Sequence, residues 1–209
     1  KQIMYNGFMK TAFCLIESVL YLITVIMDLE KLDSIPYKYA LLAVCVLYGI
    51  YRLFREKDRI SLLVLIIRVL TAIADWFLLV RVDHYLTGVI LFCAAESLYA
   101  LLVASRKSWI LRAAIWLSAG ILLMLFREFS PLYLAAAYSI IWLSFNVIDA
   151  FKNRQMAAGI GFLLFWICDI LVGLFNLGVW TSFTANGNWL FYGPSQIILT
   201  AGSYEHEKK

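Results

Sequence analysis

The sequence predicts an all-α membrane protein, a polytopic bundle of about eight transmembrane helices in a single domain that covers residues 1–209. Composition is the first reason: 63% of the residues are hydrophobic, only 15% are charged, and the mean hydropathy is +0.82. Soluble domains have roughly 45–50% apolar and about 25% charged residues, so this chain has too few polar side chains to cover a water-exposed surface. The second reason is that long apolar segments alternate with short polar loops along the whole chain.

Eight mainly apolar segments are candidates for crossing the ~30 Å hydrocarbon core of a bilayer, which takes about 17–25 residues per helix. The predicted spans are residues 8–27, 38–54, 60–80, 86–104, 109–126, 132–151, 156–175 and 189–203. Because the loops are short, neighbouring helices are expected to run antiparallel. The last loop is the longest, and its Asn186–Gly187 pair predicts a turn before the eighth span.

Lysine and arginine are distributed unevenly between the two sides of the predicted bundle. One side carries thirteen of them, with Arg112 among these, the other side carries four, and Arg68 lies within a span, which accounts for all 18. Since loops rich in Lys and Arg stay in the cytoplasm, we expect a multi-pass protein of the cell membrane with both termini cytoplasmic. The net charge of +4 lies in these loops and does not indicate a nucleic-acid partner. Aromatic residues near span ends, such as Trp189, are expected in an interfacial belt.

A weak internal repeat recurs at a spacing of about 95 residues, as in membrane folds built from parallel repeats. Pro36 and Pro131 are 95 positions apart, and each opens an even-numbered span. Asp75 and Asp169 are 94 positions apart, and each lies late in the following span. The sequence therefore predicts four helices plus four, with the two aspartates at corresponding places and at one depth.

Five ionisable side chains fall inside predicted spans, and such residues are functional candidates because burying a charge in hydrocarbon is costly. At ~1.5 Å per residue, Asp75, Asp169 and Gln196 lie roughly 9–13 Å below the outer helix ends. The remaining ionisable residues, Glu17, Arg68 and Glu96, lie deeper, at roughly 15–20 Å. An ion pair of Arg68 with Glu17 or Glu96 would be structural, with the other carboxyl group free to line a cavity.

Asp75 and Asp169 form the candidate reactive pair. Two carboxylates at one depth repel each other, so one of them is expected to hold a proton that can serve in general acid catalysis. Asn146 and Asp149 lie near a span end, where we expect them to be solvated. The two histidines, His84 and His206, lie outside the spans and the four cysteines lie in apolar runs, so the sequence predicts neither a metal site nor a cofactor.

Three stretches of the chain resemble the YhhN-like membrane proteins, a family that includes animal lysoplasmalogenases. Residues 71–102 read TAIADWFLLVRVDHYLTGVILFCAAESLYALL, with an aspartate, a short polar turn, and a closing Leu-Tyr. Residues 157–174, AAGIGFLLFWICDILVGL, are similar to the second aspartate helix of that family. Residues 190–203, LFYGPSQIILTAGS, are similar to its closing Tyr-x-x-x-Gln segment.

The resemblance implies that Asp75 and Asp169 are the catalytic carboxylates. It implies hydrolysis of the vinyl-ether bond of a lysoplasmalogen, a lysophospholipid substrate, without metal or cofactor. Positions close to the pair are candidate substrate-binding neighbours: Glu96, Tyr99, Tyr192 and Gln196. The chain departs from the family pattern before both aspartates, at Ala74 and Cys168; at Glu96, often His or Gln in the family; and at Lys38–Tyr39, where a Lys-Pro pair is common.

Two other classes of function fit the same sequence features. A proton-coupled transporter would also contain a repeat, buried carboxylates and an intramembrane arginine, although helices broken at corresponding places would be expected. A lipid-binding or assembly protein would use the carboxylates only for helix packing. The sequence leaves the oligomeric state open.

Overall fold

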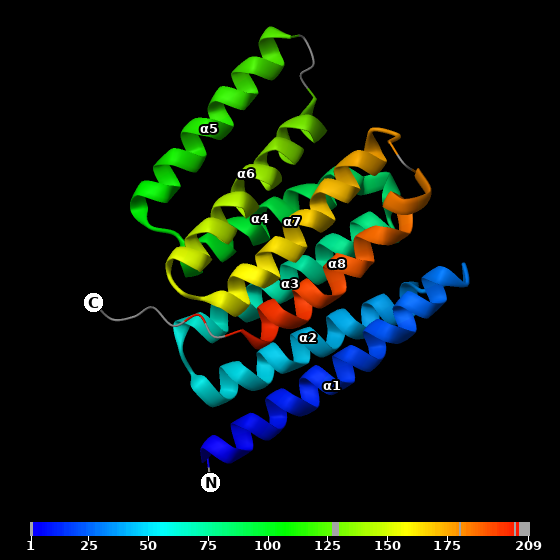
Figure 1. Cartoon of the computed structure of the whole chain (residues 1–209), viewed down its shortest axis with the longest axis vertical. Coiled ribbons are helices and arrows are strands. Elements are labelled where there is room, and N and C mark those ends of the chain that lie inside the picture. Colours follow the sequence, from blue (N-terminus) through cyan, green and yellow to red (C-terminus); the bar gives the residue numbers. More distant parts are fainter. Residues whose placement is uncertain (1, 127–129, 180, 203, 205–209) are drawn as a thin grey trace.

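The computed structural model describes residues 2–126, 130–179, 181–202 and 204, and within these it contains helices and no strand. The chain forms an all-α bundle of roughly antiparallel helices (Figure 1). The helices are α1 (Gln2–Leu29), α2 (Ile35–Glu56), α3 (Arg59–Leu79), the short 3₁₀ helix η1 (Val82–His84), α4 (Tyr85–Val103), α5 (Arg106–Leu125), α6 (Pro131–Lys152), α7 (Met156–Asn176) and α8 (Thr181–Ala201).

Seven segments within the described residues, one in each of α1 to α7, are long and apolar enough to cross a membrane. The chain is therefore a multi-pass helical membrane protein. The predicted spans 1 to 7 each fall on one of these helices, with ends that differ by a few residues. An eighth crossing by α8 stays a prediction. The predicted loop residues Arg127 and Glu128, the tail residue His206 and the terminal lysines lie outside the described residues.

The start of α8 corrects the predicted loop. A turn was expected at Asn186–Gly187, but α8 begins at Thr181 and runs through this pair. Asn-Gly favours a turn only as an isolated peptide preference, and tertiary packing overrides such preferences. Here Gly187 is buried, and α8 packs along α7.

Gly193 and Pro194 lie inside α8 and do not end it. Proline has no backbone N–H, so the carbonyl group four residues earlier loses its helical donor. The Tyr21 hydroxyl of α1 donates to this Leu190 carbonyl at 3.1 Å. A Cβ atom on Gly193 would lie 2.7 Å from the Tyr21 ring, so only glycine leaves room for that ring. The Gly-Pro pair thus forms the docking point of α1 on α8.

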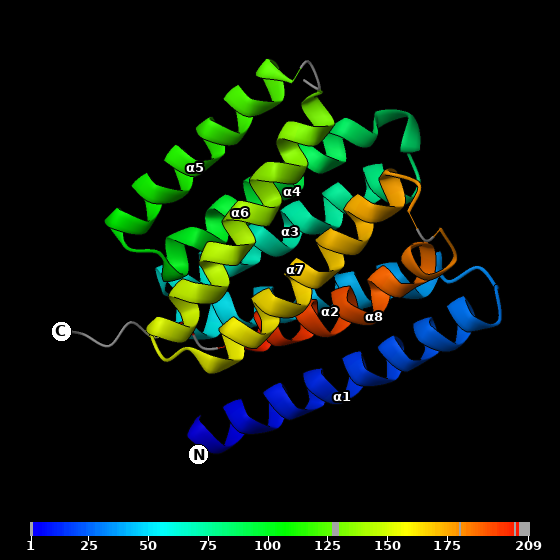
Figure 2. The same ribbon diagram turned by 45° about the horizontal axis from the view of Figure 1, so that its top comes forward.

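The helices pack in an order that is similar in the two halves (Figures 1 and 2). α2, α3 and α4 pack in sequence, and α6, α7 and α8 do the same. α4 packs against α6, and α8 packs against α2, so the two sets of three helices meet at both junctions. α1 lies at one edge against α2 and α8, whereas α5 lies at the opposite edge against α6. This order places the helices of the two aspartates, α3 and α7, inside the bundle.

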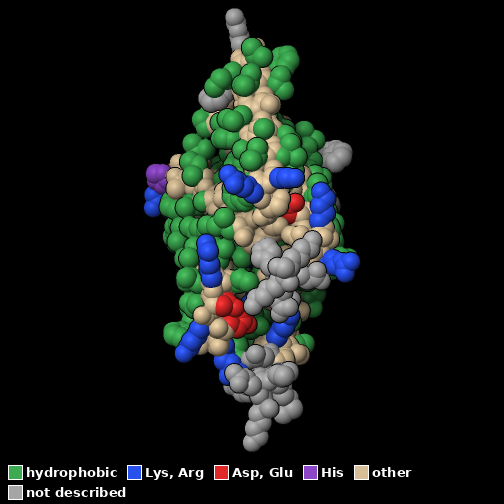
Figure 3. Space-filling view, turned by 90° about the vertical axis from the view of Figure 1, so that its left-hand side faces the viewer, with side chains coloured by type: hydrophobic (Ala, Val, Ile, Leu, Met, Phe, Trp, Pro, Cys, Tyr) green, Lys and Arg blue, Asp and Glu red, His purple; other side chains and the backbone are tan. Residues whose placement is uncertain are grey.

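The ends of several helices are held by local caps. The Asp58 carboxylate accepts a hydrogen bond from the Ser61 backbone N–H at 2.7 Å, which lowers the pKa of Asp58 and starts α3. Ser105 and Ser130 cap α5 and α6 in the same way. Lys and Arg side chains gather on the end of the bundle where α2 ends and α3 begins (Figure 3). Such a charged end is typical of a cytoplasmic face.

Gly88 sets the distance between α3 and α4 beside Asp75. A Cβ atom at Gly88 would lie 2.7 Å from the Leu78 side chain and 2.9 Å from the Ala74 backbone carbonyl oxygen. We predict that Gly88→Ala destabilises the protein by about 1–3 kcal/mol, because the backbone of α3 must move away. Thermal unfolding, monitored by size-exclusion chromatography, measures the loss of stability. Gly173→Ala is the control, since a Cβ there meets nothing within 4 Å; equal loss in both variants would contradict the prediction.

Candidate active site

A cavity of about 460 Å³ lies between α3, α4, α6, α7 and α8. It extends to the end of the bundle where α3 ends and α4 begins, because Asn176 at the end of α7 and Asn188 of α8 line it. Its wall is mainly apolar and aromatic, and it includes Leu78, Val89, Phe92, Ala136, Ile140, Phe165 and Trp189. Three carboxyl groups also line it: Asp75, Glu96 and Asp169. The cavity therefore contains both predicted catalytic residues.

Asp75 on α3 is held by Tyr192 on α8. The Tyr192 hydroxyl donates a hydrogen bond of 2.6 Å to a carboxylate oxygen of Asp75. Both side chains are almost fully buried, at 5% and 3% exposure. The structure thus joins two residues that are 117 positions apart in the chain, both of which the sequence predicts for the site.

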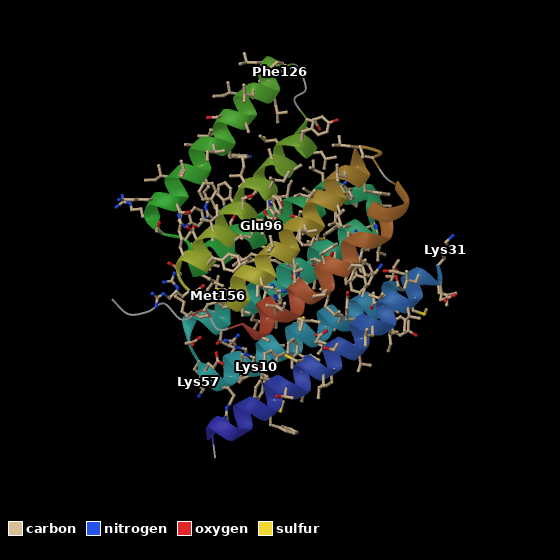
Figure 4. All side chains as sticks on the ribbon, in the orientation of Figure 1. Lys10, Lys31, Lys57, Glu96, Phe126 and Met156 are labelled. Atoms are coloured by element: carbon tan, nitrogen blue, oxygen red, sulfur yellow. The ribbon has the colours of Figure 1, made fainter. Side chains whose placement is uncertain are left out.

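Asp169 on α7 and Glu96 on α4 meet at one hydroxyl group. Ser139 of α6 lies 2.5 Å from Oε1 of Glu96, and it also hydrogen-bonds Oδ2 of Asp169. Figure 4 places Glu96 among the central helices, away from Lys31 and Lys57 at opposite ends of the bundle. The sequence reasoning missed Ser139. Serines within helices commonly bond to their own backbone, as Ser144 does here, so a lone serine in an apolar span carries little signal.

Aromatic rings fix the position of the Tyr192 side chain. Its ring lies 4.9 Å from the Trp189 ring, 5.7 Å from Phe165 and 6.0 Å from Phe92, measured between centroids. Trp189, which the sequence predicts for an interfacial belt, is only 4% exposed, because its ring packs on Tyr192 and forms part of the cavity wall.

A second cluster of buried polar side chains, around Arg68 and Glu17, lies outside the cavity lining. Arg68 donates a hydrogen bond to Oε1 of Gln196, and its guanidinium group lies 5.2 Å from the centre of the Tyr99 ring. Glu17 accepts a hydrogen bond of 3.3 Å from the Cys45 thiol. The sequence predicts an ion pair of Arg68 with Glu17 or Glu96, and this prediction is wrong. Within the described part of the chain, no carboxylate lies within 4.0 Å of the Arg68 guanidinium group.

Two predicted site neighbours, Tyr99 and Gln196, lie apart from the other predicted site residues. Neither lines the cavity; both contact Arg68 instead. The reason is that α3 and α8 run antiparallel, so that Tyr192 meets Asp75 and the next turn of α8 meets Arg68. Gln196 therefore lies deeper than the aspartate layer in which the sequence placed it.

Asn146 and Asp149 are buried, which contradicts the prediction of a solvated helix end. Arg112 of α5 forms an ion pair with Asp149 of α6 at 2.8 Å and hydrogen-bonds Asn146 at 2.9 Å. Arg112 is fully buried beneath Trp109 and Trp142, whose ring centres lie 5.5 and 5.6 Å from its guanidinium carbon. These contacts fasten α5 to α6.

Comparison with known proteins identifies the family. The model of the YhhN family matches residues 12–203, nearly the whole chain. The chain belongs to the YhhN family. No curated protein and no solved structure match it.

In this member of the YhhN family, the cavity has acidic and hydroxyl groups but no basic side chain among its described lining residues. Carboxyl groups that face one cavity from different helices can donate and accept protons around a bound molecule. At the start of α2, Lys38 pairs with Asp28 at 3.0 Å and lies 5.1 Å from the ring centre of Trp189, a residue of the cavity wall. Within the described residues, no group of three or more His, Cys, Asp or Glu is arranged to hold a metal ion.

We predict that Asp149→Ala destabilises this YhhN protein by about 3–5 kcal/mol, because it leaves the Arg112 charge buried without its partner. The double variant Arg112→Met/Asp149→Leu should recover most of that loss, since no buried charge then remains. Chemical unfolding in mixed micelles measures both. Asp83→Ala, at an exposed ion pair, is the control and should change stability little. A double variant no more stable than Asp149→Ala would contradict the prediction.

Proposed function

We propose that this protein is an integral membrane hydrolase that cleaves the vinyl-ether bond of lysoplasmalogen-type lysophospholipids. The observation that carries the proposal is the cavity in which Asp75 of α3 and Asp169 of α7 face one apolar space. The match to the YhhN family supports the coarser statement that this is a membrane protein of that family. The resemblance of residues 71–102, 157–174 and 190–203 to lysoplasmalogenases is the reason for choosing this substrate class.

The chemistry of the bond suits paired carboxyl groups. Cleavage begins when an acid delivers a proton to the alkenyl carbon remote from the ether oxygen, which leaves an oxocarbenium ion. A carboxylate stabilises this cation and takes a proton from the attacking water, as paired carboxylates do at glycosidic bonds. The resulting hemiacetal then breaks between carbon and the glycerol oxygen. The products are a fatty aldehyde and a glycerophospho-alcohol, and neither a metal nor a covalent intermediate is needed.

The size and the apolar wall of the cavity suit one hydrocarbon chain, such as the alkenyl chain of the proposed substrate. Its volume of about 460 Å³ falls within the roughly 300–1,000 Å³ of small-molecule pockets. The apolar wall suits a hydrocarbon chain, and the two asparagines, Asn176 and Asn188, lie where a polar head group would remain near the membrane surface. A single-chain amphiphile would then present its ether bond to the carboxyl groups.

The placement of the protein in the membrane belongs to the same proposal. The end of the bundle rich in Lys and Arg would face the cytoplasm, with both termini there, and the cavity would extend toward the opposite surface. The matching order of helix packing supports the 4+4 repeat, with α3 and α7 as equivalent helices. In that arrangement Asp75 and Asp169 approach the substrate from opposite halves of the chain.

A proton-coupled transporter is the second candidate, favoured by the three carboxyl groups in one cavity. Transport by alternating access commonly uses helices that are interrupted at corresponding places in the two halves. α3 and α7, which carry the aspartates, are continuous from Arg59 to Leu79 and from Met156 to Asn176. This continuity favours the hydrolase.

We predict that Asp75→Asn and Asp169→Asn each lower kcat/KM for an alkenyl lysophospholipid by about 10²–10⁴-fold, because each removes an acid or a base. Aldehyde release by the purified protein in detergent measures the rate, and size-exclusion chromatography shows that the variants are folded. Asp83→Asn, whose exposed side chain lies outside the cavity, is the matched control and should retain activity. If folded wild-type protein shows no turnover on vinyl-ether, ester or amide lipids, this result would contradict the proposal and favour transport.

A further inference from the structure

Ser139 makes more contacts with carboxyl groups than its single proton can serve. A serine hydroxyl donates one hydrogen bond, and an ionised carboxylate can only accept. Yet the Ser139 hydroxyl lies within hydrogen-bond distance of both Glu96 and Asp169. If both carboxyl groups were ionised, one of these contacts would bring two oxygens together with no proton between them. The geometry therefore requires a proton on one of the two carboxyl groups.

The surroundings of the pair favour the same arrangement. Glu96 is fully buried, and its second oxygen has no hydrogen-bond partner. Two negative charges this close would repel in an apolar wall. No Lys, Arg or His lies among the described residues that line the cavity, so no cation offsets them there. The titratable groups that do line it are Asp75 of α3, Tyr85 and Cys93 of α4, Tyr133 of α6, Cys168 of α7 and Tyr192 of α8.

Asp75 is in a different situation. Its hydrogen-bond partner, Tyr192, is a donor with an O–H group aimed at the carboxylate. This contact is complete without a proton on Asp75. The two predicted catalytic aspartates are thus unequal: one shares a hydroxyl with a second carboxyl group, and the other accepts from a phenol.

We propose that Glu96 and Asp169 hold a single proton between them through Ser139, which makes Asp169 the general acid and leaves Asp75 as the general base. The assignment of roles rests on the proposed hydrolase function, whereas the shared proton does not. Glu96 acts as a proton reservoir, and Ser139 is a positioning residue that connects it to the acid. Asp169 is the member of the pair that delivers the proton, because it is partly exposed while Glu96 is fully buried.

The proton moves by a paired shift along the three side chains. With the proton on Glu96, its O–H donates to Ser139, and the Ser139 O–H donates to Asp169. When both protons shift together, Asp169 becomes the acid and donates to Ser139, whose O–H now points to the Glu96 carboxylate. Both arrangements keep one proton and one negative charge in the pair, so the shift needs no outside donor.

The catalytic cycle then balances. Asp169 gives its proton to the alkenyl carbon, whose π electrons form the new C–H bond, and an oxocarbenium ion remains. Water adds to that ion and loses a proton to Asp75, which gives a neutral hemiacetal. Asp75 passes this proton to the departing glycerol oxygen as the C–O bond breaks. The hemiacetal hydroxyl returns its proton to Asp169 and becomes the aldehyde carbonyl, so both aspartates regain their starting states.

Infrared difference spectroscopy of the protein at neutral pH tests the shared proton without any substrate. The wild type minus Glu96→Gln spectrum should contain the carbonyl stretching band of one protonated carboxyl group. Ser139→Ala should shift that band, since the carboxyl group loses its hydrogen-bond partner. The matched control is Ser144→Ala in the same helix, whose hydroxyl donates to the Ile140 carbonyl and which should leave the band in place. A missing band, or a band that Ser139→Ala does not move, would overturn the proposal.

Kinetics with the alkenyl lysophospholipid test the positioning role. Ser139→Ala should lower kcat by roughly 10–100-fold, part of the 10²–10⁴-fold effect of a general acid, with KM changed less than about twofold. Ser139→Thr keeps a hydroxyl and should recover most of kcat, which a purely structural role would not require. Unchanged kcat in Ser139→Ala, or equal loss in both variants, would overturn the relay. If wild-type protein hydrolyses no lipid, the proposed function fails, while the infrared result still decides the shared proton.

Discussion

Polar side chains within a bilayer must find their partners inside the protein, and the rest of this structure depends on that constraint. Lipid offers no hydrogen bonds, so an unpaired charge or hydroxyl inside a span costs several kcal/mol. In this chain the partners come from different helices. Tyr192 of α8 reaches Asp75 of α3, and Asp149 of α6 reaches Arg112 of α5. Each such pair positions one helix against another.

The polar pairs are of two kinds, which differ in whether they line the cavity. The Arg112 pair and the contact between Arg68 and Gln196 are buried, and they connect helices without lining the cavity described above. Asp75 and Asp169 line a mainly apolar cavity. The same kind of helix-connecting contact thus borders a cavity only where the packing leaves room. In α8 one face carries both kinds, with Tyr192 at the cavity and Gln196 one turn deeper.

Much of the fold followed from composition and loop length. Long apolar runs leave the backbone no alternative to helices in a membrane, and short loops force antiparallel neighbours. The reasoning went wrong where local preference competed with packing. Asn186–Gly187 favours a turn in isolation, but the packing of α8 against α7 keeps it helical. Asp149 lies near a helix end, yet a partner on α5 draws it into the bundle.

The sequence by itself determined that this is a helical membrane protein with aspartates 94 positions apart in two apolar spans, because hydropathy and spacing are properties of the chain alone. Only the tertiary structure decided which polar groups meet. Ser139 carries no signal in the sequence, and it joins Glu96 to Asp169 only because α4, α6 and α7 pack together. Hydrogen bonds act over about 3 Å, and residues this far apart in the chain come within that distance only through the packing of helices.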